Sequence, residues 1–210
     1  MAGHRNVRAP IQYSSDELQS VVDTVRAMRF TPAPLADAVV IDLEPHADER
    51  GAFARTFCAD EFADHGLPAA FPQCNLSYNC AAGTLRGMHY NCATLGESKL
   101  IRCVRGAIHD VIVDLRADSP TRWQWFAIEL TARNARALFV PVGFAHGFLT
   151  LEDECDVHYH MGATYRPEAS RGLRWDDPTI AIDWPDSPTL ISDHDAGYPN
   201  LDPATFDLSD

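Results

Sequence analysis

Short runs of alternating apolar and polar residues recur along most of the chain and predict strands. Alternation with a period of two is the pattern of a strand that buries one face. The expected strands are residues 39–43, 52–56, 73–78, 84–91, 98–104, 107–115, 123–130, 137–140, 146–151 and 156–161. Turn residues such as Gly106, Pro120 and Gly143 separate them. This spacing predicts a β-sandwich or barrel.

A helical period appears near the N-terminus. Ser14 and Glu17 have the spacing of a capping box, and apolar residues at helical spacing follow as far as Met28. The pattern predicts one amphipathic helix over residues 15–29, after a polar arm. We therefore expect an N-terminal arm and helix over residues 1–35 and one domain over residues 36–210. Within that domain, a single helical turn is expected at residues 61–65.

Composition narrows the classes of partner. The chain has 210 residues, 46% of them hydrophobic, and a formal net charge of −13. Such a charge argues against nucleic acid or an anionic membrane as the main partner, because both favour a cationic surface. No apolar run reaches membrane length and no secretory signal is visible, so we expect a cytoplasmic protein. The six cysteines are expected to be reduced and mostly buried.

One stretch combines a histidine with several cations. Residues 83–106 carry His89, Arg86, Lys99, Arg102 and Arg105 between two turn glycines. Two expected strands in this stretch suggest a hairpin that binds an anion. Arg86 and His89 are three residues apart and would face opposite ways on an ideal strand, but a bulge at Gly87 would turn both inward. Arg102 alternates away from Lys99 and is expected at the solvated surface.

Two segments have the form of cupin motifs. Residues 141–146 read Pro-Val-Gly-Phe-Ala-His, which fits the second motif, and Gly83 with His89 fits part of the first. Cupin metal sites need converging imidazoles and a carboxylate, which His89, Glu97 and His146 would supply. However, Asn91 stands where the first motif has its second histidine. A metal-dependent cupin enzyme is therefore kept as an alternative.

Several motifs in one order resemble the dTDP-4-dehydrorhamnose 3,5-epimerase family. They are residues 85–90 (LRGMHY), 99–102 (KLIR), 110–116 (DVIVDLR), 119–121 (SPT), 141–148 (PVGFAHGF), 175–178 (WDDP) and 182–185 (IDWP). The resemblance runs from about Val39 to Asp195. It implies an all-β fold, a cupin-type double-stranded β-helix or jelly-roll barrel. The N-terminal amphipathic helix and a few short peripheral helices would lie around that barrel.

The resemblance also implies a reaction. The substrate would be a nucleotide-linked 4-keto-6-deoxyhexose, epimerised at C3, C5 or both through an enolate, with no metal and no redox cofactor. His89 would be the base, Asp195 would orient it, Tyr159 would be the acid, and Lys99 would stabilise the enolate. From the residues alone, Tyr159 alternates with Val157 and Met161 onto one strand face, which favours an inward position.

The same resemblance implies a nucleotide subsite and an assembly. Arg50, Arg86, Gln73 and Asn75 would contact the nucleoside diphosphate, His146 would line the pocket, and Tyr165 would stack on the base. A homodimer with exchanged strands is expected. The chain departs from the family pattern at Arg55, Asn91 and Ser170. These departures leave the base and the sugar open, and they keep a non-catalytic sugar-nucleotide binding protein as a second alternative.

Overall fold

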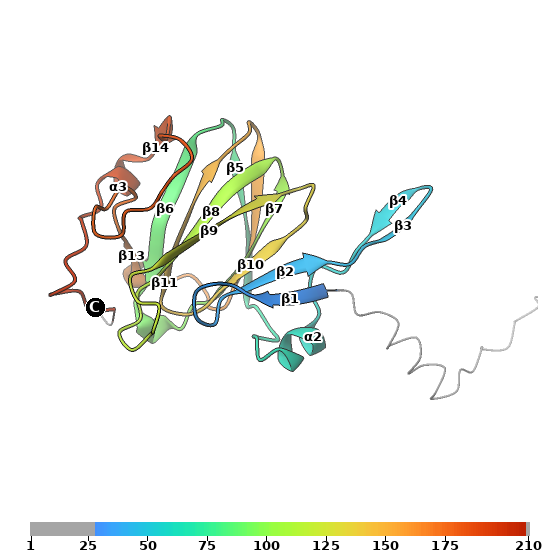
Figure 1. Ribbon diagram of the computed structural model, residues 1–210, viewed down its shortest axis with the longest axis horizontal. Coiled ribbons are helices and arrows are strands. Elements are labelled where there is room, and N and C mark those ends of the chain that lie inside the picture. The colour runs from blue at the N-terminus through green and yellow to red at the C-terminus, as the bar shows by residue number, and fades with distance from the viewer. Residues whose placement is uncertain (1–27, 209–210) are drawn as a thin grey trace, which may run out of the picture.

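Two antiparallel sheets face each other and enclose the core (Figure 1). The computed structural model describes residues 28–208. The first sheet has the order β1 (Met28–Pro32), β2 (Val39–Leu43), β10 (Ala137–Val140), β7 (Lys99–Arg105), β12 (Cys155–Met161) and β5 (Gln73–Asn79). The second has the order β13 (Ser170–Gly172), β6 (Thr84–Asn91), β11 (Phe144–Thr150), β8 (Ala107–Asp114) and β9 (Trp125–Thr131). This arrangement confirms the all-β, jelly-roll prediction.

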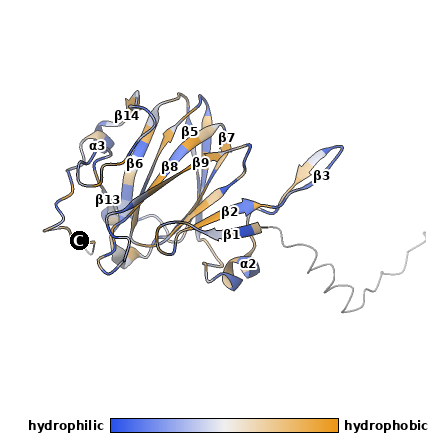
Figure 2. Cartoon of the chain, in the orientation of Figure 1, coloured by the Kyte–Doolittle hydropathy of each residue, from blue (hydrophilic) through white to orange (hydrophobic). Residues whose placement is uncertain are grey.

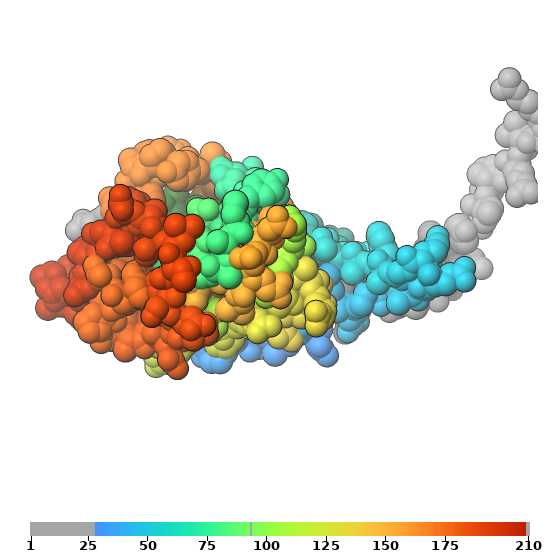
Figure 3. All heavy atoms as spheres, turned by 90° about the horizontal axis from the view of Figure 1, so that it is seen from above, coloured from blue at the N-terminus to red at the C-terminus, as the bar shows by residue number. Residues whose placement is uncertain are grey.

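Smaller elements surround the two sheets. β14 (Leu190–Ile191) pairs with β6 in parallel, and β3 (His46–Asp48) with β4 (Gly51–Phe53) forms a hairpin that projects from the barrel (Figures 1 and 3). The short helices are α2 (Ala59–Asp64), α3 (Asp193–Ala196), η1 (Ala93–Leu95) and η2 (Pro167–Ala169). Among the described residues, no helix has the length and apolar content that a membrane crossing needs.

Three apolar clusters hold the fold together. The first lies between the sheets and includes Ile101, Ile112 and Phe148. The second lies between the outer face of the second sheet and the C-terminal segment, which contributes residues such as Leu173 and Ile180. The third packs α2 against the outer face of the first sheet. The inner strands β10 and β11 are buried along their whole length because both of their faces pack in these clusters, and Figure 2 shows apolar residues along the strands of both sheets.

The N-terminal helix is not found where its end was expected. Residues 15–27 of that prediction lie outside the described residues, but Met28 and Arg29 begin β1. β1 pairs with β2, with Met28 opposite Leu43. The buried Met28 and the ring of Phe30 both pack in the third cluster. Tertiary packing therefore decides this segment in favour of a strand.

The expected hairpin over residues 83–106 is also wrong. β6 and β7 have the predicted positions, but they belong to different sheets. The connection through η1 crosses from one sheet to the other, so the inward faces of β6 and β7 look at each other across the barrel. His89 and Lys99 therefore approach one cavity from two sides.

The outer face of the first sheet is partly uncovered. Arg102, expected to be solvated, is instead 9% exposed, and its Nη1 is one of four buried side-chain atoms without a hydrogen-bond partner among the described residues. Burial lowers the pKa of Arg102 to about 10, so it is still a cation at neutral pH. Nearby, Tyr78 and Val104 expose apolar surface.

All six cysteines are free thiols, as predicted. Their expected burial holds for Cys103 and Cys155 only, whereas Cys74 and Cys80 are exposed. Cys74 lies on the edge strand β5, whose outer face is open to solvent. The prediction of mostly buried cysteines is therefore wrong.

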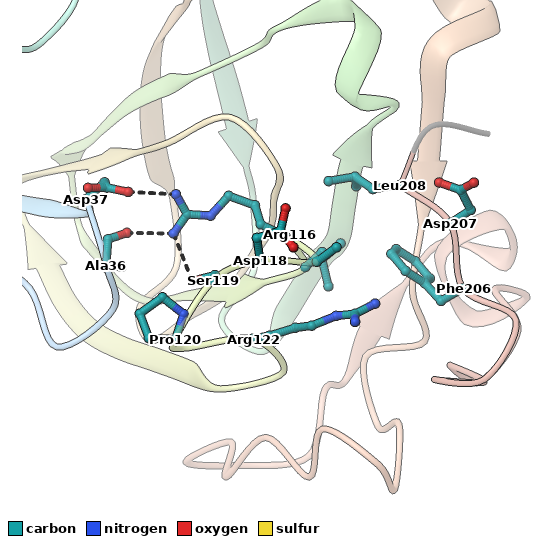
Figure 4. Close-up of a pocket in the computed structure, with 12 residues that line it drawn as sticks. Ala36, Asp37, Arg116, Asp118, Ser119, Pro120, Arg122, Phe206, Asp207 and Leu208 are labelled. Carbon is teal, nitrogen blue, oxygen red and sulfur yellow. Dashed lines mark hydrogen bonds and ion pairs between the residues drawn. The ribbon is translucent and has the colours of Figure 1, made fainter.

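A buried carboxylate ties the start of the barrel to the turn after β8. Asp114 accepts hydrogen bonds from Arg116 Nη2 at 2.8 Å, Thr121 Oγ1 at 2.7 Å and Ser119 Oγ at 2.5 Å. Arg116 also reaches Asp37 at 2.7 Å, as Figure 4 shows. Arg116, Asp37 and Ser119 line a surface depression of about 530 Å³. Because Arg116 is fully occupied by protein acceptors, the cluster is structural.

Acid should weaken this cluster. Burial by itself raises the pKa of Asp114, but the hydrogen bonds from Arg116, Ser119 and Thr121 outweigh it, and the net pKa is lowered. A lowered folded-state pKa contributes stability above the ordinary value of about 3.9, and that stability is lost as pH falls further. Asp114→Asn should therefore lower the free energy of unfolding, measured with urea, by about 3 kcal/mol at pH 7 and by clearly less at pH 3. The exposed Asp118→Asn is the control, and a pH-independent loss would contradict the prediction.

Candidate active site

A cavity of about 460 Å³ lies between the two sheets and collects most of the predicted site residues. Its walls come from β5, β6, β7, β11 and β12, with α3 and the segment after β12 at its rim. Eight of the ten predicted residues line it: His89, Lys99, Tyr159, Asp195, Arg86, Asn75, His146 and Tyr165. Gln73 lies just behind this wall, and Arg50 lies elsewhere.

His89 and Asp195 form a hydrogen-bonded pair. His89 Nε2 donates to Asp195 Oδ1 at 2.8 Å, and the Gly87 amide donates to Asp195 Oδ2 at 3.1 Å. Asp195 is buried, whereas the His89 side chain is 40% exposed toward the cavity. Burial raises the pKa of Asp195, but the bond from His89, its charge and the Gly87 amide outweigh this and lower it. Asp195 is therefore ionised and fixes the imidazole, with the lone pair on Nδ1.

The strand that carries His89 contains the predicted bulge. His146 pairs with His89 and Phe148 pairs with Arg86, so two residues of β6 lie opposite Gly147 alone. Gly87 has φ = 138°, and a Cβ there would come within 2.5 Å of Gly147 Cα. Only glycine fits this backbone and this approach. The bulge allows both Arg86 and His89 to face the cavity.

Lys99 lies on the cavity wall opposite His89 and forms an ion pair with Glu97. Its side chain is 9% exposed, and Nζ lies 3.0 Å from Glu97 Oε1. Asn91 Nδ2 donates to the same oxygen at 2.5 Å. Lys99 is thus held at the start of β7 with its charge inside the cavity, where the dielectric is low. A cation in such a place stabilises negative charge that develops on a bound ligand.

Tyr159 projects into the cavity from β12, as the alternation predicted. Its ring meets the His146 ring edge-on, with centroids 5.9 Å apart. His146 Nε2 in turn lies 2.7 Å from Asp110 Oδ1, and both residues are buried. Burial, followed by the negative charge of Asp110, raises the pKa of Tyr159 well above its ordinary value. The phenol is therefore neutral and a proton donor at physiological pH.

The remaining predicted residues form a polar rim. Arg86 Nε donates to Asn79 Oδ1 at 2.7 Å, with its guanidinium at the mouth of the cavity. Gln73 Nε2 donates to Asn75 at 3.0 Å, and Gln73 Oε1 accepts the Tyr165 amide, also at 3.0 Å. Tyr165 is exposed. Gln73 therefore positions two lining residues without lining the cavity itself.

Arg50 is separate from this group. It lies at the tip of the β3–β4 hairpin, 84% exposed, with its guanidinium on Asp48. In Figures 1 and 3 the hairpin points away from the barrel. A role for Arg50 in the cavity of its own chain is therefore not supported.

The metal-site alternative is not supported by the positions of its ligands. His89 is engaged by Asp195, His146 by Asp110, and Glu97 by Lys99. In the part of the chain that the structure describes, no three His, Cys, Asp or Glu side chains are close enough together to hold a metal ion. The cupin motifs thus supply the barrel without its usual ligand set.

Two residues that contact the predicted site residues were missed from the sequence. Asp110 stands at an inward position between Ile108 and Ile112, and a charge at such a position was the available signal. Tyr198 packs edge-on against His89, with ring centroids 6.0 Å apart, and its hydroxyl is bonded to His194. It comes from an irregular segment, where periodicity gives no information.

Comparisons with known proteins point to one family. The dTDP-4-dehydrorhamnose 3,5-epimerase family profile matches residues 32–203. The enzyme of that name from Methanothermobacter thermautotrophicus is 45% identical over 157 residues, which cover 75% of this chain and 84% of that protein. A dTDP-4-dehydrorhamnose 3-epimerase from Streptomyces niveus is 38% identical, with 80% and 81% covered.

A solved structure shows the same fold. The dTDP-4-dehydrorhamnose 3,5-epimerase of Bacillus anthracis, solved with TDP and PPi bound, superposes with a TM-score of 0.80 at 40% identity. The alignment covers 83% of this chain and all of that one. The similarity therefore extends over both sheets and the cavity.

Proposed function

The chain belongs to the dTDP-4-dehydrorhamnose 3,5-epimerase family and is an isomerase, and from this premise we propose how its cavity works. The substrate is a nucleotide-linked 4-keto-6-deoxyhexose of deoxysugar biosynthesis, and the reaction inverts C3, C5 or both. The observation that carries the proposal is the placement of His89 and Tyr159 on facing sheets around one cavity, with Lys99 on the strand next to that of Tyr159.

His89 removes the first proton. The C4 ketone acidifies the hydrogens on C3 and C5, so a base of moderate strength suffices once the enolate is stabilised. With Nε2 donating to Asp195, Nδ1 of His89 accepts the proton. Asp195 then stabilises the imidazolium by its negative charge. The Gly87 amide keeps Asp195 in place during this step.

Lys99 and Tyr159 complete the inversion. The Lys99 ammonium lies where the enolate oxygen develops its charge, and it is already oriented by Glu97. Tyr159 belongs to the sheet that faces His89, and it gives a proton to the face of the planar enolate carbon opposite His89. Its raised pKa keeps the phenol protonated until that step. The net reaction moves protons only and leaves the oxidation state unchanged.

Solvent exchange tests this function. Incubation with 4-keto-6-deoxyhexose nucleotides in D₂O should place deuterium at C3, C5 or both, which NMR resolves position by position. Substrates with different bases would identify the nucleotide. Absence of exchange with all of them would overturn the proposal, and tight binding without exchange would instead favour the binding-protein alternative.

The proposed assembly is a homodimer. Arg50 on its projecting hairpin, the exposed Phe53 beside it and the partly open outer face around Arg102 support a second copy. A partner would cover Tyr78 and Val104 and give Arg102 an acceptor. The hairpin would carry Arg50 to the partner's cavity, where a forked guanidinium suits a diphosphate. The proposed location is the cytoplasm, which suits the exposed thiols of Cys74 and Cys80.

Mixing two inactive variants tests the dimer. Arg50→Ala and His89→Asn should each be inactive alone. In a mixed dimer, the Arg50→Ala subunit has its own His89 and receives Arg50 from its partner. Equal mixing should therefore restore about a quarter of the wild-type activity, because half of the dimers are mixed and each has one complete site. A monomer by light scattering, or no recovery after subunit exchange, would contradict it.

A further inference from the structure

Glu97 is a buried carboxylate that the proton transfers do not use. It precedes β7, lines the cavity, and its side chain is only 3% exposed. Its Oε1 accepts a hydrogen bond from Asn91 Nδ2 and forms an ion pair with Lys99 Nζ. A carboxylate removed from water normally uses both oxygens, since an ionised group without partners is costly to bury.

The second oxygen of Glu97 has no protein donor. No hydrogen bond to Oε2 is formed within the described residues. Yet it is not among the four buried, unpartnered atoms of these residues, which are Arg102 Nη1, His109 Nε2, Asp110 Oδ2 and Arg122 Nε. Glu97 lines the cavity, and we infer that the 3% of its side chain that is exposed opens into that cavity. Oε2 is therefore an acceptor available to a ligand.

Its position beside Lys99 indicates which ligand group it meets. Lys99 Nζ faces the C4 oxygen in the proposed reaction, and Glu97 lies one hydrogen-bond length from Nζ. The next ring substituents are those on C3 and C5. C5 of a 6-deoxyhexose bears a methyl group, which gives a carboxylate nothing to accept. C3 bears a hydroxyl, which donates.

We propose that Glu97 is a specificity-determining residue that accepts a hydrogen bond from a donor on the ring carbon next to the ketone. The inference rests on the proposed function. It restricts the substrate class to 4-keto-6-deoxyhexoses with a hydroxyl or ammonium group at C3. Asn91 acts as a positioning residue, because its amide holds Oε1 and so turns Oε2 toward the sugar.

A comparison of two substrates tests it. Deuterium exchange at C3 and at C5 is measured for a nucleotide-linked 4-keto-6-deoxyhexose and for its 3-deoxy analogue, and kcat/KM is compared. Wild-type protein should prefer the hydroxylated substrate by about 10- to 100-fold, the range of a hydrogen bond to a charged group. Glu97→Gln keeps the shape of the side chain but not its charge, and the preference should fall at least about fivefold.

The controls separate the possible failures. Glu129→Gln, an exposed glutamate on β9, should keep the wild-type preference. If Glu97 only anchors Lys99, Glu97→Gln slows both substrates equally and the preference is unchanged, which overturns the inference. Equal rates of the two substrates with wild-type protein overturn it without any variant. No exchange with either substrate, by contrast, is a failure of the proposed function.

Discussion

His89→Asn should lower kcat for deuterium exchange and for epimerisation by about 10²- to 10⁴-fold, the range that a positioned general base contributes. The reason is local. Asparagine has no lone pair of comparable basicity, whereas the His89 imidazole is fixed by Asp195 at 2.8 Å with Nδ1 toward the cavity. Because the His89 side chain is 40% exposed, stability should change little. The measurement is NMR exchange in D₂O beside a thermal unfolding curve.

The matched control is His65→Asn. His65 is exposed at the end of α2, where its ring stacks on Phe30, and it lies outside the cavity wall. Its replacement should leave exchange within about threefold of wild type, as expected for a surface substitution. Equal activity of His89→Asn and wild type would remove His89 as the base.

Tyr159→Phe should separate exchange from inversion. Phenylalanine retains the ring that packs against His146 but has no proton to give. His89 can still remove a proton and return a deuteron to the same face, so exchange persists at the position that His89 serves. Formation of the inverted product should fall by about 10²- to 10⁴-fold, because the opposite face has no donor. Both rates come from one NMR time course.

Tyr78→Phe is the control for the loss of a tyrosine hydroxyl. Tyr78 lies on the exposed outer face of β5, which points away from the cavity. Because phenylalanine keeps the ring that a partner subunit would cover, both rates should stay near wild type in this variant. If Tyr159→Phe slowed exchange and inversion by the same factor, Tyr159 would not be the acid of a separate step.

Local patterns predicted the strands better than their partners. The alternation placed β2, β6 and β10 to the residue and turned Tyr159 inward, because a period of two is a local property. The pairing of β7 with β10 and β12 depends on where the 92–98 connection crosses the barrel. No feature of residues 83–106 indicates that the chain crosses to the other sheet between β6 and β7, and the prediction of a hairpin was therefore wrong.

The residues of the cavity could be predicted only where they belong to a family motif. His89, Lys99 and Asp195 come from family motifs, and the structure brings them together with Tyr159. The carboxylates that pair with His146 and Lys99 were not predictable in the same way. The bond from Asp110 to His146 joins residues 36 positions apart, and the pairing of Glu97 with Lys99 was concealed by its expected role as a metal ligand.

The division of the cavity between two sheets has a consequence for the independence of the two proposed proton transfers. His89 and its support belong to β6 and α3, whereas Tyr159 and Lys99 belong to the neighbouring strands β12 and β7. Under the proposed roles, the base and the acid are therefore held by different sheets. A substitution in one sheet should then change proton transfer on one face of the enolate and leave the group on the other face in position.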